Sequence, residues 1–284
     1  SAASDVYKRQ QLALTPTVAF GDANSDPASE TSYIDDRDIR TLVESGTNVR
    51  LQANNDITWG GNDTTYDLTV TNPGDISLVA GRNIILGGTF SFANVNFSAL
   101  ANATAADGVI AAERDTFKGG IDTFNASLFG GAGSGGTGGD ITLKVGAGLT
   151  ANSADNLRIG PVQGRNVTIA AGPGTSRIGF FPNTAVQTAI DNVQIVGSSS
   201  VTLSGRIYVN TVGGLTVTAP LVNWTTEGTT AIGGYSDAPV KFIENGTLVR
   251  YGILNNNSDQ TRLALGAAGT APQYSATYGL SLIH

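Results

Sequence analysis

Three carboxylates near the start of the chain, Asp35, Asp36 and Asp38, are the residues of this sequence that come nearest to a catalytic group. Paired carboxylates hydrolyse glycosidic bonds, one as the acid and the other as the base or nucleophile. The same three acids open the segment Asp35 to Gly46, whose apolar residues recur at helical spacing. Because a helix dipole stabilises negative charge at its start, we expect a short capping helix here instead of a hydrolytic pair.

A second candidate for chemistry is GGTGGDITL, Gly135 to Leu143, which nearly fits the calcium-binding repeat G-G-x-G-x-D-x-U-x. In that repeat the glycines turn the backbone and the Asp supplies oxygen ligands. Here Thr142 stands where the repeat needs an apolar residue, and no tandem copy completes a calcium shell. Asp140 is therefore a weak calcium candidate, and we expect it simply to begin a strand.

The two ends of the chain limit the remaining chemistry. Ser1 to Gln10 resembles the in-frame translation of a sequencing adapter, and Leu280 to His284 resembles the same adapter read from the opposite strand. We therefore expect only Gln11 to Gly279 to be natural sequence. The chain has one histidine, His284, and no cysteine, so Gln11 to Gly279 cannot assemble a nucleophilic triad, a zinc site or a reactive thiol. We expect no catalytic residue and no cofactor.

The charge balance excludes another class of function. The chain of 284 residues carries a net charge of −7, and only 14% of its residues are charged. Nucleic acids and anionic membranes attract proteins through clustered Lys and Arg. We therefore expect no nucleic-acid partner.

The elements that must hold any such residues are short strands. A phrase of Asp or Asn, an apolar residue, a polar residue and another apolar residue returns along the chain, as in DISL at Asp75 to Leu78 and NVTI at Asn166 to Ile169. Asp and Asn can bond the nearby backbone and tolerate turn conformations, so each is expected to start a strand. The strand-starting residues predicted in this way are Asn48, Asp56, Asp67, Asp75, Asn83, Asp140, Asn156, Asn166 and Asn192.

The spacing of the strands indicates how they stack. Val49 and Ile57, Ile76 and Ile84, and the first apolar residues of several other neighbouring phrases are eight residues apart. Three such steps make a coil of roughly 22 to 27 residues, a period typical of solenoids. The predicted fold is all-β, a right-handed parallel β-helix with a short helix near its start and one irregular excursion.

This interpretation divides the chain into segments. Between the adapter-like ends 1–10 and 280–284, we expect a polar lead and capping helix, a first β-helix array, a helical or irregular excursion ending in a glycine-rich loop, a second array, and a stretch of weaker coils with a hairpin turning at Asn245 and Gly246. In order, these five segments cover residues 11–47, 48–101, 102–139, 140–224 and 225–279.

A tripeptide, Gly-Arg-Asn, occurs twice just before a strand, with Arg82 and Arg165 at its centre. Each arginine could touch a ligand, although we expect both to be solvated at coil corners. The strings SGTNVRLQANNDITW, GDISLVAGRNIILGG and GRNVTIAAG resemble the β-helical body of filamentous haemagglutinin-type exoproteins, the secreted partners of two-partner secretion systems. IDDRDIRTLVESGTNV is similar to the helix-then-strand entry of that family.

The resemblance implies a non-enzymatic segment of a large secreted bacterial surface protein, acting as an adhesin, a biofilm factor or a stalk for a distal toxin. It also implies export through an outer-membrane barrel partner and a receptor on a host or neighbouring cell, for which a glycan is one candidate. Two alternatives stay open. A carbohydrate-active β-helix enzyme, a lyase or glycosidase, would need a charged cluster along one face, and a phage tail-spike shaft would form trimers.

Overall fold

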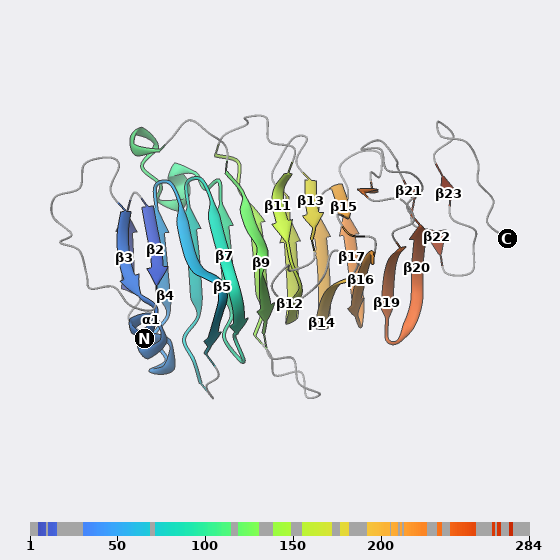
Figure 1. Cartoon of the computed structure of the whole chain (residues 1–284), viewed down its shortest axis with the longest axis horizontal. Coiled ribbons are helices and arrows are strands. Elements are labelled where there is room, and N and C mark those ends of the chain that lie inside the picture. The colour runs from blue at the N-terminus through green and yellow to red at the C-terminus, as the bar shows by residue number, and fades with distance from the viewer. Residues whose placement is uncertain are drawn as a thin grey trace.

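The computed structural model describes residues 5–9, 11–15, 31–68, 72–114, 119–130, 139–148, 155–171, 177–181, 192–204, 206–209, 211, 213–225, 232–234, 239–253, 263–264, 266–267 and 273–274. Strands run across the long axis of the molecule and follow one another from the amino-terminal to the carboxy-terminal end (Figure 1). Most of them are parallel and belong to one sheet that does not close into a barrel. The all-β class expected from the sequence is confirmed.

The parallel pairings form three ladders, named A, B and C here. Ladder A joins β1 (Asp5–Arg9), β4 (Val49–Ala53), β6 (Ile76–Ala80), β8 (Phe97–Ala101), β10 (Ile141–Val145), the second parts of β12 (Val162–Ala170) and β14 (Val193–Ser204), and β17 (Leu221–Thr225).

Ladder B joins β3 (Thr31–Asp35), β2 (Gln11–Thr15), the first parts of β5 (Ile57–Asp67), β7 (Ile84–Ser91) and β9 (Ile121–Phe129), and then β11 (Asp155–Ile159), β13 (Arg177–Phe180), β15 (Arg206–Val209) and β18 (Ile232–Gly234). Ladder C joins the second parts of β5, β7 and β9, the first parts of β12 and β14, and then β16 (Leu215–Ala219) and β19 (Pro239–Glu244).

From β4 onward the chain visits the ladders in the order A, B, C and then returns to A. Long strands such as β5 and β14 pass from one ladder to the next at a shift in register, where the backbone bends. One such passage through the three ladders is called a coil below. Neighbouring coils are therefore joined by backbone hydrogen bonds along every ladder.

Alternate side chains of every ladder point into one continuous apolar core. Ile76, Leu78, Ile84, Val193 and Ile195 are all at most 1% exposed, as the alternation in their phrases predicts. In ladder A, Val49 pairs with Ile76 and Ile76 pairs with Phe97, so like residues stack on like from coil to coil. The inward residues of the period-two pattern therefore form one core that extends along the axis from coil to coil.

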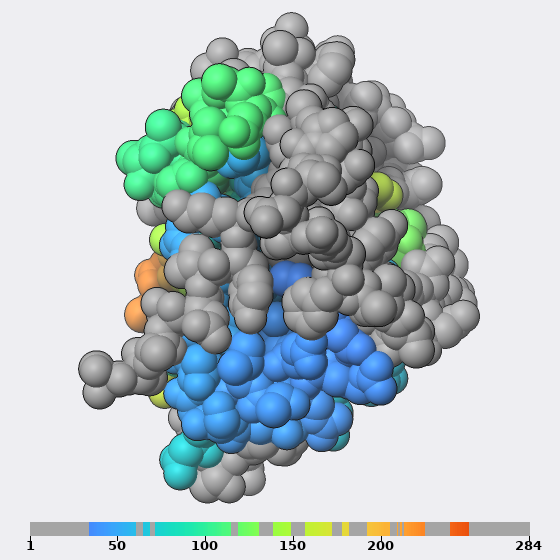
Figure 2. Space-filling view, turned by 90° about the vertical axis from the view of Figure 1, so that its left-hand side faces the viewer, coloured from blue at the N-terminus to red at the C-terminus, as the bar shows by residue number. Residues whose placement is uncertain are grey.

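The helix predicted near the start is α1 (Asp36–Glu44). Asp35 caps it by accepting a hydrogen bond from the backbone N–H of Arg37 at 2.9 Å. Ile39 and Val43 are fully buried against the core. Figure 2 looks onto this end of the molecule, where α1 and the strand after it form the blue surface.

The predicted hairpin also forms. β19 pairs antiparallel with β20 (Thr247–Ile253), and Asn245 and Gly246 both have positive φ, as a type I′ turn requires. β20 pairs in turn with β22 (Gly266–Ala267), and a separate small sheet joins β21 (Leu263–Ala264) to β23 (Gln273–Tyr274). Among the described residues, no helix is long and apolar enough to cross a membrane.

The adapter-like start forms a strand, which does not bear on its origin, and the expected boundary of the excursion differs from the structure. The adapter-like residues Asp5 to Arg9 form β1, which pairs in register with β4. Ladder bonds use backbone groups, so a strand edge can accept a segment whatever its origin. The excursion is shorter than 102–139, because β9 lies inside that range and pairs with β7. The described part of the excursion before β9 is Asn102 to Arg114, with the short 3₁₀ turns η1 (Ala105–Asp107) and η2 (Ala111–Glu113), and residues 115–118 and 131–138 lie outside the described residues.

Candidate functional site

The residues just before each strand of ladder A form a turn, called a corner here. At this corner the polar side chains of successive coils are linked by hydrogen bonds into a row, called the corner chain. The Asn48 side chain accepts a hydrogen bond from the Asp75 backbone N–H at 2.8 Å, and the Asn96 side chain accepts one from the Asp140 backbone N–H at 3.0 Å. Between them, the Asn96 amide donates to the Asp75 carboxylate at 2.9 Å. The Asn166 amide donates to Asp140, and the Ser200 hydroxyl donates to Asn166. Each strand-starting residue therefore bonds the corner of a neighbouring coil.

A shorter chain of the same kind lies at the corner before ladder B. The Asp56 carboxylate accepts a hydrogen bond from the Asn83 backbone N–H at 2.9 Å, and the Asn83 side chain accepts one from the Gly120 backbone N–H at 3.0 Å. At these corners the backbone carbonyls still accept from the first N–H of a neighbouring strand, as Asn83 does from Ile57, whereas the backbone N–H groups point to Asx side chains instead. The Asx side chains supply the hydrogen-bond partner of these N–H groups.

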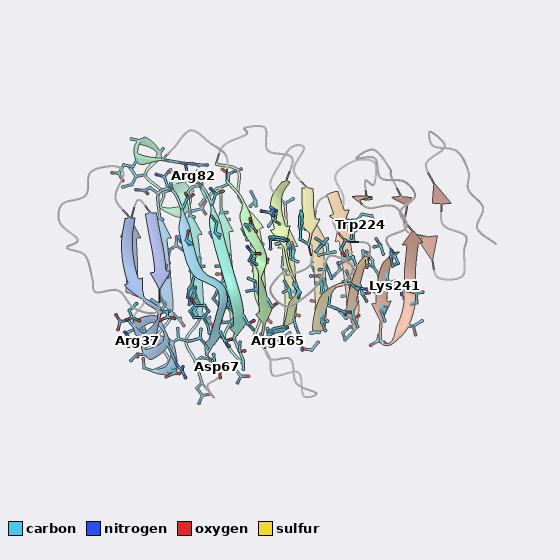
Figure 3. All side chains as sticks on the ribbon, viewed as in Figure 1. Arg37, Asp67, Arg82, Arg165, Trp224 and Lys241 are labelled. Atoms are coloured by element: carbon cyan, nitrogen blue, oxygen red, sulfur yellow. The ribbon has the colours of Figure 1, made fainter. Side chains whose placement is uncertain are left out.

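The repeated Gly-Arg-Asn tripeptide belongs to these corners. Arg82 forms an ion pair and a second hydrogen bond with Asp56 of the preceding coil, and Arg165 does the same with Asp140 at 2.7 and 2.9 Å. The two arginines lie at opposite edges of the strands (Figure 3). Both arginines lie at coil corners, as expected, and the Arg165 side chain is 40% exposed, but each guanidinium also reaches back by one coil to a carboxylate, a contact that the expectation did not include.

The glycine of the first tripeptide, Gly81, is explained by close approach. A Cβ placed on Gly81 would lie 2.0 Å from the carbonyl oxygen of Asn54 in the preceding coil. Only a residue without a side chain allows the two backbones to come this near. At Gly164 the approach is looser, since a Cβ there would lie 3.2 Å from the carbonyl oxygen of Gly139. The two tripeptides therefore share the ion pair of Arg and the corner hydrogen bond of Asn, and the close contact by Gly is strict only at Gly81.

Asp140, the weak calcium candidate, has both carboxylate oxygens engaged. Oδ1 accepts from Arg165 Nε and from the backbone and side chain of Asn166, and Oδ2 accepts from Arg165 Nη2. The hydrogen bond from Arg165 is the main cause that lowers the pKa of Asp140 below its usual value. Within the described residues, no three acidic or histidine side chains are gathered as a metal site would need. These contacts favour a structural role for Asp140.

Because its pKa is lower in the folded state, Asp140 stabilises the fold at pH values above its unfolded pKa, about 3.9. That stabilisation is lost as the pH falls through the folded pKa. We expect the difference in melting temperature between the natural chain and Asp140→Asn to be largest near pH 6 and to narrow below about pH 4. The pair is partly exposed, so the effect should stay below roughly 1 kcal/mol. A difference independent of pH would contradict this role.

The other predicted strand-starting residues have varied positions. Asp67 is the last residue of β5, so its assignment as a strand start is wrong. The phrase that follows it, at residues 69–71, lies outside the described residues, as does the side chain of Asn156. Asn192 precedes β14 and donates to the hydroxyl of Thr216 in the next coil at 2.7 Å. Its contact differs from that of Asn48, because Asn192 donates to a side-chain hydroxyl and its own Oδ1 finds no hydrogen-bond partner among the described residues.

Asp35, Asp36 and Asp38, the acids considered as a glycosidase pair, have different environments at the start of α1. Arg37 pairs with Asp35 and lowers the pKa of that carboxyl to about 2. Burial and the neighbouring Asp35 raise the pKa of Asp36, whose Oδ1 is buried and has no hydrogen-bond partner within the described part of the chain. Asp38 is exposed. The cavity beside Asp36 measures about 80 Å³ and is lined by Trp59 and other residues, whereas ligand sites usually measure about 300–1,000 Å³.

A larger groove of about 340 Å³ lies on the outer face of ladder A. It crosses β4, β6, β8 and β10 beside the corner chain of Asn and Asp. Its floor includes one row of paired residues, in which Arg50 lies next to Ser77, Ser77 next to Ser98, and Ser98 next to Thr142. Apart from the calcium-like segment that contains Thr142, no catalytic or metal-binding motif in the sequence includes these residues. Their only signal was their place as the polar member of each alternating phrase.

The excursion packs on the outer face of the same ladder, where it forms the green surface in Figure 2. Buried polar residues hold it: the Gln52 side chain donates to the carbonyl of Gly108, and Asn54 donates to the carboxylate of Glu113 and accepts from the N–H of Ile110. Val109 packs with Val79 and Ala103 in a small second core. Arg50 also donates to the carbonyl of Asp107 at 2.7 Å, so the excursion orients one wall of the groove.

Comparisons of the sequence and structure with protein-family models, curated proteins and solved structures give no match.

Proposed function

We propose that the three ladders are the faces of a right-handed parallel β-helix, whose coils each contribute one strand to each face. The observation that carries this proposal is the order in which the chain visits the ladders, A, B and C in repeated sequence, with parallel pairing at each return. The corner chains of Asx residues and the shared apolar core support it, because both continue from coil to coil.

From this architecture we infer that the chain is a structural or adhesive rod segment of a large secreted bacterial surface exoprotein. Such a segment serves as an adhesin, a biofilm factor or a stalk for a distal toxin. Its coils are joined by the backbone hydrogen bonds of the ladders, by the corner chains, and by the ion pairs Arg82–Asp56 and Arg165–Asp140. These contacts support a load-resisting rod, and the repeated Gly-Arg-Asn corners agree with the resemblance to haemagglutinin-type exoproteins. The proposed partners are an outer-membrane secretion barrel and a receptor on a host or neighbouring cell.

Small-angle scattering combined with analytical ultracentrifugation of the purified chain tests the rod. We expect a monomer with an elongated pair-distance distribution. The eight described strands of ladder A alone span seven spacings of about 4.8 Å, or roughly 34 Å along the axis. A compact, globular particle would contradict the rod. A stable trimer would instead favour the tail-spike alternative.

A carbohydrate-active enzyme remains the second candidate, since the groove on ladder A is large enough for a ligand. We expect no product release from polyuronates, glucans or host glycans, with or without calcium, because the carboxylates in that groove already serve the corner chain. The measurement is chromatography of the products after long incubation. Activity that disappears when the groove carboxylates are removed, in the double variant Asp75→Asn, Asp140→Asn, or when the acids at α1 are removed, in Asp35→Asn, Asp36→Asn, would overturn the rod and establish a glycosidase.

A further inference from the structure

We propose that the groove on the outer face of ladder A binds an uncharged glycan chain, which lies along the axis of the coils. The proposal rests on the surface role inferred above and specifies what that surface would hold. It begins from the dimensions of the groove, about 340 Å³, which fall within the range of small-ligand sites. The groove is formed by four successive strands of ladder A and is therefore elongated across the strands.

Hydrogen-bonding groups repeat along the groove at the spacing between parallel strands, about 4.8 Å. Ser77, Ser98 and Thr142 each present a half-buried hydroxyl in the same register row. Among the described residues, the hydroxyls of Ser77 and Thr142 make no hydrogen bond, and Ser98 makes only a long one of 3.5 Å to the carbonyl of Ile76. The row therefore offers regularly repeated donors and acceptors to a ligand with repeated hydroxyls.

The charges of the groove favour a neutral chain over an acidic one. Arg50 contributes one positive charge and Asp75 one negative charge. Asp140 is the other carboxylate in the lining, and its charge is offset by its ion pair with Arg165. The positive and negative charges therefore cancel, and the groove has no excess of cations to attract uronic or sialic acids.

Arg50 is held in a fixed position at one end of the row. Its guanidinium donates to the carbonyl of Asp107 in the excursion and to the side chain of Gln52. A guanidinium carries five N–H donors, and these two bonds both use Nη2, so further donors are available to a sugar hydroxyl. The excursion thus orders one wall of the groove before a ligand arrives, which lowers the entropic cost of binding.

Saturation-transfer NMR on the full chain tests the proposal, with maltohexaose, cellohexaose and laminarihexaose as neutral probes and hexagalacturonate as the acidic comparator. We expect at least one neutral probe to bind more tightly than hexagalacturonate. Ser98→Tyr, which fills the middle of the groove, should weaken binding by about tenfold or more, and Arg50→Gln should weaken it by a smaller factor. Gln194→Tyr adds the same ring to an exposed outward position on ladder C and should leave binding unchanged.

The proposal is overturned if no neutral probe binds, if hexagalacturonate binds best, or if Gln194→Tyr weakens binding as much as Ser98→Tyr does. Should Ser98→Tyr fail to fold by circular dichroism, Thr142→Tyr tests the same groove one strand further along. Scattering measured on the same samples separates the two proposals. An elongated particle without glycan binding refutes the groove alone, whereas a compact particle refutes the rod.

Discussion

Replacing Ile76 or Ile195 by Asp is expected to lower the free energy of unfolding by roughly 3 to 5 kcal/mol. Both side chains are at most 1% exposed and lie within the continuous core. A carboxylate at either position would be buried within the apolar core cluster, which contains no cation among the described residues. Urea denaturation followed by circular dichroism measures the loss.

The matched controls are the neighbouring residues on the same strands. Ser77 is half-buried and Gln194 is exposed, and both point outward, so Ser77→Asp and Gln194→Lys should each change stability by no more than about 0.5 kcal/mol. The comparison is between adjacent positions of one strand, which removes differences in local backbone structure. Equal destabilisation by inward and outward substitutions would refute the assignment of faces.

The second large effect is expected at Gly139, which lies at the corner before β10. A Cβ on this residue would lie 1.7 Å from the carbonyl oxygen of Val95 and 3.0 Å from its backbone nitrogen. Because both obstacles are backbone atoms, the coils would have to move apart to admit a methyl group. We expect Gly139→Ala to cost at least about 1 to 3 kcal/mol, visible as a lowered melting temperature.

Gly246→Ala provides the comparison for this steric effect. Gly246 lies in the hairpin turn, where a Cβ would meet nothing within 4 Å, although its φ is +77°. The substitution should therefore cost only the strain of a left-handed backbone, about 1 kcal/mol. If the loss at Gly246 equals or exceeds the loss at Gly139, close approach between coils is not what requires glycine at Gly139.

Local patterns in the sequence predicted the parts of the structure that depend on neighbouring residues. The alternation around Ile76 and Ile195 identified the inward faces, the acids and spaced apolar residues identified α1, and Asn245-Gly246 identified the hairpin. Each of these signals acts over a few residues: the alternation of side chains in a strand, the cap of a helix, and the positive φ of a turn.

Contacts between coils were not predictable in the same way. Arg82 and Asp56 are separated by 26 residues, and nothing near either one indicates that they meet. Asn54 and Glu113 are 59 residues apart, and the buried position of Asn54 follows only from the excursion that covers it. The period of a repeat predicts that coils stack, but the lengths of the intervening loops determine which side chains face each other. Asp67 was misassigned for the related reason that its phrase begins where β5 ends.

The corner contacts also bear on the order in which the chain acquires its structure. Arg82 reaches Asp56, and Arg165 reaches Asp140, each in the coil that came just before along the chain. Asn54 bonds Glu113, which comes later in the chain, but this contact spans only two returns to ladder A. Because these arginines find their carboxylates in the coil formed just before, and the longest of these contacts is complete after two further returns, structure can grow by successive addition from the amino-terminal end. A polypeptide threaded through a narrow opening could therefore fold as it emerges, with each finished coil preventing its return.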